Sequence, residues 1–177
     1  MFRSSIAATI TRHNVSDEMN LLFLCTGNSC RSILAEAIFN HLAPTGWKAM
    51  SAGSQPTGQV HPRSLALLER EGISIDGLHS KSWDDLPMTP DVVITLCSEA
   101  SGETCPTYFG PVLHAHWGVE DPARATGTDK EVDAAFMTAY RLLRSRIEAF
   151  LALPMEQLDL DRACLKVELD RIGTLSE

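Results

Sequence analysis

Apolar residues along this chain fall into short blocks whose spacing alternates between that of a strand and that of a helix. A continuous apolar run at 21–25 is typical of a buried strand. Leu34, Ile38 and Leu42 follow at intervals of four and predict one face of a helix over 32–42. The first part of the chain is therefore expected to form a strand, a tight loop and a helix.

The same alternation continues along the chain. Further strands are predicted at 47–51, 91–97 and 112–116, and further helices at 62–71, 128–151 and within 154–173. Thr128 and Glu131 form a capping-box pattern ahead of the longest apolar stripe. This order predicts an α/β fold with a doubly wound, four-stranded parallel sheet of order 2-1-3-4 and helices on both faces.

The apolar pattern also sets the expected organisation of the chain. Residues 1–18 are polar without a sustained period, so we expect an N-terminal extension there. The sheet domain is expected over 19–153, and 154–177 is expected to be a C-terminal helical extension. The 177 residues suffice for one hydrophobic core, and no apolar run approaches the roughly 20 residues that span a bilayer.

Charge and cysteine content narrow the classes of partner. The chain has 15 Lys and Arg against 23 Asp and Glu, a formal net charge of −8, which opposes general affinity for nucleic acid or anionic membranes. Any anion site must therefore be local. Five cysteines are an odd number, and no secretory segment leads the chain, so we expect a cytoplasmic protein with free thiols. We also expect a monomer.

The segment between the first predicted strand and helix carries the strongest chemical signal. Cys25 is followed by five residues and then by Arg31 and Ser32, where the helix begins. Small or polar side chains fill the interval: Thr26, Gly27, Asn28, Ser29 and Cys30. Such a loop lets successive backbone N–H groups surround a tetrahedral oxyanion, and the helix N-terminus adds further donors. The Arg31 guanidinium supplies a planar fork for two anion oxygens.

The same loop suits a nucleophilic cysteine at position 25. A thiol with a pKa near 8.5 is only a few per cent ionised at about pH 7, and N–H donors with a guanidinium favour its thiolate. Ser32 can donate a further hydrogen bond to that sulfur. Packing in the core is the alternative for Cys25 and the favoured interpretation for Cys30. A nucleotide P-loop is excluded, since its Lys-Ser/Thr ending and glycine spacing are absent.

Several motifs together resemble those of a known family. They are the segment 24–32, Ser51-Ala-Gly53, 95–98, Cys105-Pro106 and 116–123. Over about residues 20–153 the chain resembles the low-molecular-weight tyrosine phosphatase fold and, within it, the thioredoxin-coupled arsenate reductases. The cysteine loop and Asp121-Pro122 are shared by both groups and imply a phosphate-like ligand. Ala123-Arg124 stands where the phosphatases usually carry paired tyrosines, which favours the reductases.

The resemblance to the reductases implies a relay of three thiols. Cys97 ends the third predicted strand, which lies beside the first, so its thiol can approach Cys25 across one strand spacing of about 4.8 Å. Cys105 follows eight residues later in a polar loop that closes at small entropic cost. By this resemblance Cys25 attacks arsenate while Asp121 protonates the leaving oxygen. Cys97 then attacks Cys25, Cys105 attacks Cys97, and thioredoxin reduces the final disulfide. No organic cofactor is expected.

Other functions stay open at this point. A tyrosine phosphatase would need only Cys25, Arg31 and Asp121, without the second cysteine pair. A noncatalytic redox sensor would form a Cys97–Cys105 disulfide without sustained turnover. Thioredoxin is the expected reductant of a reductase, with a glutaredoxin or a small thiol as the alternatives.

We assign no metal. A zinc site would combine several candidate ligands: Cys25, Cys30, Cys97 and Cys105, with His114 and His116. Their spacings fit zinc ribbons poorly, and the two histidines are interpreted as packing or hydrogen-bonded strand residues. Some relatives bind potassium through residues that match Asn28, Glu36 and Ser51. The matching carboxylate is not evident in 79–83, where Lys81 can supply the positive charge instead.

Overall fold

The computed structural model describes residues 18–98, 104–155 and 161–176, and they contain one parallel sheet of order β2-β1-β3-β4. The strands are β1 (Met19–Cys25), β2 (Trp47–Gly53), β3 (Val92–Thr95) and β4 (Leu113–His116). The predicted parallel sheet and its order are confirmed. The predicted extension over 1–18 lies, apart from residue 18, outside the described residues.

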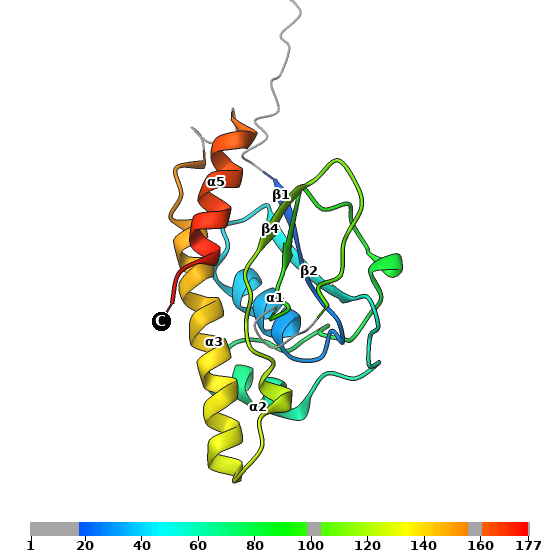
Figure 1. Ribbon diagram of the computed structural model, residues 1–177, viewed down its shortest axis with the longest axis vertical. Helices are drawn as coiled ribbons and strands as arrows, with labels where there is room; N and C mark the ends of the chain where they lie inside the picture. The colour runs from blue at the N-terminus through cyan, green and yellow to red at the C-terminus, as the bar shows by residue number, and fades with distance from the viewer. Residues whose placement is uncertain (1–17, 99–103, 156–160, 177) are drawn as a thin grey trace, which may run out of the picture.

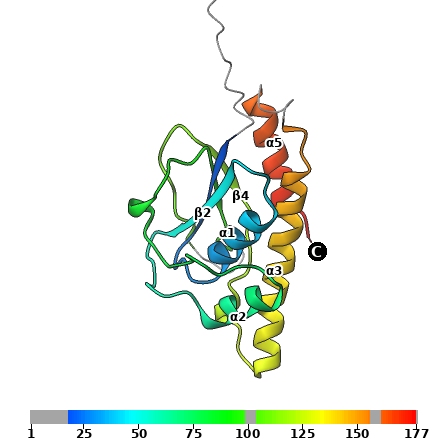
Figure 2. The ribbon, with the colours of Figure 1, turned by 180° about the vertical axis from the view of Figure 1, so that it is seen from behind.

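Helices connect the strands and pack along the sheet (Figure 1). The α-helices are α1 (Arg31–Leu42), α2 (Pro62–Arg70), α3 (Asp129–Leu151) and α5 (Arg162–Gly173), and the short 3-10 helices are η2 (Trp83–Asp85) and η4 (Pro122–Arg124). α3 and α5 lie side by side, as the view from behind also shows (Figure 2). The predicted capping box begins α3: the Thr128 hydroxyl accepts from the Glu131 N–H, and the Glu131 carboxylate accepts from the Thr128 N–H at 2.8 Å.

The two faces of the sheet are covered differently. Leu21 and Phe23 on one face of β1 pack with apolar residues of α1, α2, α3 and α5 in the main core. Leu22 and Leu24 on the opposite face pack in a smaller cluster with η2, the residues just after it and the segment before β4. The prediction placed helices on both faces, whereas among the residues that the structure describes the helical cover of this second cluster is the single turn of η2. Prolines at 87 and 90, which interrupt helices, limit the helix there.

The end of β3 differs in detail from the sequence prediction. β3 ends at Thr95, so Cys97 lies two residues beyond the strand, where it is bonded to Cys105 in a disulfide. The helix predicted within 154–173 corresponds to α5, which packs on β4. Its Leu169 is fully buried and its carbonyl accepts from the Trp117 indole N–H at 2.9 Å. None of the described helices has the length and apolar character that a membrane crossing needs.

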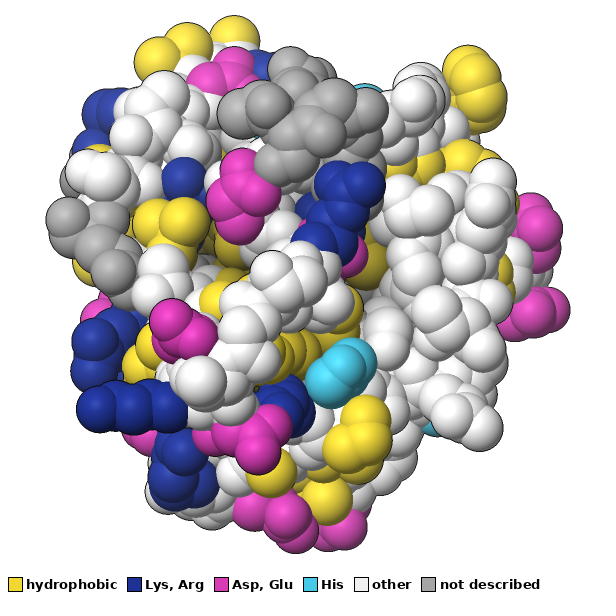
Figure 3. Space-filling view, turned by 60° about the horizontal axis from the view of Figure 1, so that its bottom comes forward, with side chains coloured by type: hydrophobic (Ala, Val, Ile, Leu, Met, Phe, Trp, Pro, Cys, Tyr) yellow, Lys and Arg dark blue, Asp and Glu magenta, His cyan; other side chains and the backbone are white. Residues whose placement is uncertain are grey.

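Strand order places three chain segments at one end of the sheet. β1 and β3 are adjacent, but the chain continues from β1 outward to β2 and from β3 outward to β4, in opposite directions across the sheet. In doubly wound folds, ligands bind at the carboxyl ends of two such neighbouring strands. Cys25 is the last residue of β1, Cys97 follows β3, and Asp121 follows β4. Figure 3 views the molecule with this end turned toward the reader. Basic and acidic side chains are interspersed on this face, so a positive field there is local rather than broad.

Candidate active site

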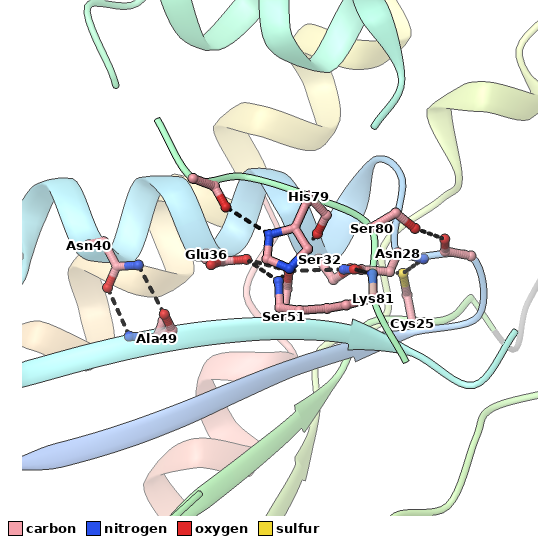
Figure 4. Close-up of polar contacts among 12 residues, drawn as sticks. Cys25, Asn28, Ser32, Glu36, Asn40, Ala49, Ser51, His79, Ser80 and Lys81 are labelled. Atoms are coloured by element: carbon pink, nitrogen blue, oxygen red, sulfur yellow. Dashed lines mark hydrogen bonds and ion pairs between the residues drawn. The ribbon is translucent and has the colours of Figure 1, made fainter. Parts of the chain in front are cut away.

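The loop between β1 and α1 folds around the sulfur of Cys25 (Figure 4). The backbone N–H of Asn28 donates to Cys25 Sγ at 3.2 Å, and Ser32 Oγ lies 3.0 Å from the same sulfur. Cys25 is a free thiol whose side chain is almost fully buried. The sulfur therefore sits at the base of the loop, beside the N-terminus of α1.

The outer edge of the loop is held by a second segment of backbone. The carbonyl groups of Thr26, Gly27 and Ser29 accept hydrogen bonds from the N–H groups of residues 55, 57 and 61. When the carbonyl groups of a loop point outward to partners on another segment, its N–H groups are free to point inward and surround an anion. The residues predicted to bind the anion are thus part of one continuous, braced loop.

Asn28 holds the loop in shape through its side chain. Its φ of 44° lies in the left-handed region, which asparagine tolerates better than most residues. Its Nδ2 donates to Ser32 Oγ at 2.8 Å and to Ser51 Oγ at 2.9 Å, and its Oδ1 accepts from the Lys81 N–H at 2.8 Å. The sequence pointed to Asn28 as an anion-binding residue, and the structure adds that it ties the loop to β2 and to the segment at 81.

Gly53 allows β2 to end directly against the loop. A Cβ atom at this position would lie 2.4 Å from the carbonyl oxygen of Thr26 and 3.0 Å from the N atom of Asn28. Only a residue without a side chain fits so close a backbone approach. The sequence motif Ser51-Ala-Gly53 by itself gives Gly53 no role. A glycine at the end of a strand, beside a predicted anion loop, is the sequence signal that indicates so close a backbone approach.

Arg31 links the loop to the segment that follows β4. Its side chain is 3% exposed, and its Nη1 donates to the carbonyl oxygen of Val119 at 3.1 Å. Its Nη2 lies 3.4 Å from Oδ2 of Asp121, while Oδ1 of Asp121 accepts from the Ala123 N–H at 3.0 Å and caps η4. Arg31 therefore brings a partly exposed carboxyl group to the edge of the loop.

Cys30 has a different environment from Cys25, although both belong to the same loop. It packs in the main core, where burial raises the pKa of its thiol to about 12 in spite of hydrogen bonds with Ser64 and Ser29 that lower it. A thiol with that pKa stays protonated at neutral pH and is a poor nucleophile. Cys25 is thus left as the candidate nucleophile of the loop.

A side-chain cation lies beneath the loop. Lys81 Nζ is 3.5 Å from Oε2 of Glu36 and 3.2 Å from the carbonyl oxygen of His79, and Ser51 donates to the same carboxylate oxygen (Figure 4). Lys81 and Glu36 are both about one-tenth exposed. Because the ammonium group already neutralises this carboxylate, the residues do not fit a potassium ion here.

The other two cysteines predicted to take part in chemistry form a disulfide. Cys97 and Cys105 are bonded, with their Cα atoms 5.4 Å apart. Cys97 is fully buried and follows Leu96, whose N–H donates to the carbonyl of Leu24 on β1 at 2.9 Å. The disulfide therefore stands beside the end of the strand that terminates in Cys25.

Comparisons with known proteins agree with this geometry. The model of the low molecular weight phosphotyrosine protein phosphatase family matches residues 20–163. An arsenate reductase from Bacillus subtilis (strain 168) is 37% identical over 131 residues, which cover 73% of this chain and 93% of that protein. The solved structure of an arsenate reductase in the phosphate binding state aligns with a TM-score of 0.61 at 28% identity, covering 76% of this chain and 97% of the other. A thioredoxin-dependent arsenate reductase from Corynebacterium glutamicum aligns with a TM-score of 0.50 at 27% identity, covering 76% of this chain and 64% of that one.

Proposed function

Because the chain belongs to the low molecular weight phosphotyrosine protein phosphatase family, we propose that its cysteine loop takes a tetrahedral oxyanion, and that this anion is arsenate, which the protein reduces to arsenite. The observation that carries the proposal is the Cys97–Cys105 disulfide beside Cys25. Hydrolysis of a phosphate ester uses no electrons and needs no such pair. Reduction of arsenate needs two electrons, which two thiols supply when they form a disulfide.

The first step joins arsenic to sulfur. Arsenate enters the loop, where the backbone N–H groups and the Arg31 guanidinium hold its oxygens. The sulfur of Cys25 attacks arsenic, and one arsenic–oxygen bond breaks. Asp121 gives its proton to the departing oxygen, which leaves as water, because hydroxide is a poor leaving group. The product is a thiol–arsenate adduct on Cys25.

The second step transfers the electrons. Cys97, as a thiolate, attacks the sulfur of Cys25, and a Cys25–Cys97 disulfide forms as the sulfur–arsenic bond breaks. The electron pair of that bond stays on arsenic, which is thereby reduced from the pentavalent to the trivalent state and leaves as arsenite. Ser32 Oγ lies 3.0 Å from the Cys25 sulfur, so its hydroxyl can donate a hydrogen bond to that sulfur as the sulfur–arsenic bond breaks.

The third step moves the disulfide away from the loop. Cys105 attacks Cys97, which releases Cys25 as a free thiol and leaves a Cys97–Cys105 disulfide. This is the combination of bonds present in the structure. Cys105 is more exposed than Cys97, so an external dithiol reaches this disulfide more easily than one at the buried Cys25. The thioredoxin dependence of the Corynebacterium relative supports thioredoxin as that dithiol.

A phosphatase is the second candidate function, and the family match favours it. It would use Cys25, Arg31 and Asp121 in the same positions and hydrolyse a phosphocysteine intermediate. The two functions separate at the second cysteine pair, which hydrolysis does not need.

The test measures both activities in matched variants. Arsenate-dependent oxidation of NADPH is followed with thioredoxin and thioredoxin reductase, and hydrolysis of an aryl phosphate is followed without them. We expect Cys97→Ser to lose the first activity and keep the second. Cys164→Ser, which changes an exposed free cysteine on α5, should alter neither. Sustained thioredoxin-dependent turnover by Cys97→Ser would exclude the relay.

A further inference from the structure

One side chain that touches the disulfide has no role in the steps above. His116 is the last residue of β4, and its Nδ1 lies 3.8 Å from Sγ of Cys105. A ring nitrogen of His116 and the sulfur atoms of Cys97 and Cys105 all lie within 4.8 Å of one another. An imidazole, a group that takes up and releases protons near neutral pH, therefore stands beside two of the reacting sulfurs.

The fold holds this ring in place from two sides. Thr95 pairs with His116 in the β3–β4 ladder, and its Oγ1 lies 2.9 Å from His116 Nδ1. At Gly118 a Cβ atom would lie 3.1 Å from His116 Nε2, so the missing side chain leaves room for the ring. The Thr95 hydroxyl also reaches the carbonyl oxygen of Ala115 at 3.4 Å. While Nδ1 carries no proton, the Thr95 hydroxyl donates to it. Once Nδ1 has taken a proton from Cys105, the hydroxyl can turn to the Ala115 carbonyl, and its oxygen then accepts from the Nδ1 N–H.

We propose that His116 is the catalytic base that takes the proton of Cys105 in the third step of the relay. The proposal rests on the proposed function. A thiol attacks a disulfide only as a thiolate, and an ordinary cysteine with a pKa near 8.5 is about 1% ionised at about pH 6.5. A base in contact with the thiol removes this limit.

The step balances without any external reagent. The proton of Cys105 passes to Nδ1 of His116, and the Cys105 sulfur attacks the sulfur of Cys97. The Cys97–Cys105 bond forms as the Cys25–Cys97 bond breaks, and Cys25 leaves as a thiolate. The Asn28 N–H, which donates to that sulfur at 3.2 Å, receives it in the loop.

The residues around the His116 ring determine which groups contribute to the pH dependence of the third step. From β3 it faces Thr95, which does not titrate, and from the segments after β3 and before β4 it faces Cys97 and Cys105. α5 approaches His116 through Gly173, which has no side chain, next to the backbone carbonyl. The pH dependence of the third step therefore reports on the imidazole and the two thiols.

The experiment is a single turnover of the reduced full chain. Wild type, His116→Gln and His114→Gln are mixed with arsenate without reductant and quenched with acid at intervals. Arsenite is measured, and the Cys25–Cys97 and Cys97–Cys105 disulfides are quantified by non-reducing peptide mapping. His114 is the matched control, because it lies on the same strand two residues earlier and its ring faces Tyr108.

We expect His116→Gln to form arsenite and the Cys25–Cys97 disulfide at the wild-type rate. Its conversion to the Cys97–Cys105 disulfide should slow by about 100-fold at about pH 6.5, the factor set by the ionised fraction of a free thiol. That slow step should speed up about tenfold per pH unit up to the thiol pKa, whereas the wild-type step should depend on pH much less steeply. Added imidazole should restore part of the rate in His116→Ala.

Other outcomes overturn the proposal. If the third step of His116→Gln keeps the wild-type rate or pH profile, His116 is not the base. If arsenite formation and disulfide transfer slow together, with no rescue by imidazole, the residue acts through packing alone. If wild type itself forms no arsenite and no Cys25–Cys97 disulfide, the proposed function fails, and that result is distinct from either of the others.

Discussion

Oδ2 of Asp121 lies 3.4 Å from Nη2 of Arg31, so the acid proposed to protonate the leaving oxygen and the cation proposed to bind the anion form an ion pair at the edge of the loop. The pair is asymmetric, because Arg31 is buried whereas Asp121 is 26% exposed. The guanidinium is thus fixed in place, with a second anchor on the Val119 carbonyl, and the carboxyl group stays partly exposed at the edge of the loop.

Asp121→Asn should slow the chemical step while leaving anion binding intact. Loss of a positioned acid lowers kcat for arsenate reduction by about 100-fold or more. KM should stay unchanged or fall, because removing the carboxylate also removes a negative charge beside the oxyanion. Steady-state kinetics with Glu120→Gln as the neighbouring control provide the measurement. An unchanged kcat in Asp121→Asn would show that the proton comes from elsewhere.

Ser32→Ala should weaken catalysis through the Cys25 sulfur. Asn28 Nδ2 donates to Ser32 Oγ at 2.8 Å, so the Ser32 proton is free to point toward Cys25. A hydrogen bond to a charged group is worth about 1.5–3 kcal/mol, which corresponds to about 10–150-fold in rate. Both arsenate reduction and aryl phosphate hydrolysis should fall, since both need Cys25 as a leaving group. A loss confined to arsenate reduction would instead place Ser32 in the thiol relay.

Local patterns were enough to predict the elements that carry the site. The apolar run that ends in Cys25 predicted β1, and the residues around Thr128 predicted the start of α3, because each signal lies within a few neighbouring residues. Lys81 is predicted to supply a positive charge near Glu36, as the structure has it, but only through the family resemblance. The close approach of Gly53 to Thr26 depends on segments distant in sequence meeting at the sheet edge. The spacing of residues along the sequence does not tell how close two distant segments come in the fold.

The covering of the sheet was harder to predict for the same reason. Alternation of strands and helices says that both faces must be buried, but not by which elements. The second face is buried by Trp83 of the one-turn helix η2 and by Leu86 and other side chains of irregular segments, none of which follows a periodic pattern. His116 is interpreted from the sequence as a packing or hydrogen-bonded strand residue, which agrees with its place on β4 and its contact with Thr95. Its contact with Cys105 spans a segment whose path the sequence does not specify.

Gly53→Ala should disturb the loop. The added Cβ atom would overlap the carbonyl oxygen of Thr26, which is backbone and cannot rotate away. We expect a loss of about 1–3 kcal/mol in the free energy of unfolding and near-complete loss of both activities. Gly27→Ala is the graded control, because its Cβ atom would meet only the Thr57 methyl group, at 3.2 Å. Chemical denaturation and activity assays check this, and a fully active Gly53→Ala protein would contradict it.

Lys81→Met should destabilise the fold, because it removes the ammonium group that neutralises Glu36. The change leaves Glu36 with no cation at its Oε2 atom, and an uncompensated buried charge destabilises a protein by about 3 kcal/mol. Potassium chloride should restore part of the thermal stability of Lys81→Met more effectively than sodium chloride does, because the freed position is lined by oxygen atoms. Wild type should respond equally to both salts. A selective potassium effect on wild type would mean that Lys81 leaves room for an ion.

Cys30 should remain a thiol under conditions in which Cys25 reacts. Burial raises its pKa from the ordinary 9.0 to about 12, so at about pH 8 iodoacetamide should label Cys25 and spare Cys30, with phosphate protecting Cys25. Since the folded pKa lies above the unfolded value, the stabilisation linked to this group is complete below pH 9.0 and is lost as pH rises toward about 12. The free energy of unfolding of wild type should therefore fall more steeply across that range than that of Cys30→Ala. Peptide mapping of the labelled protein and denaturation across this pH range measure the two effects, and equal labelling of both cysteines would show that Cys30 is ionised in the fold.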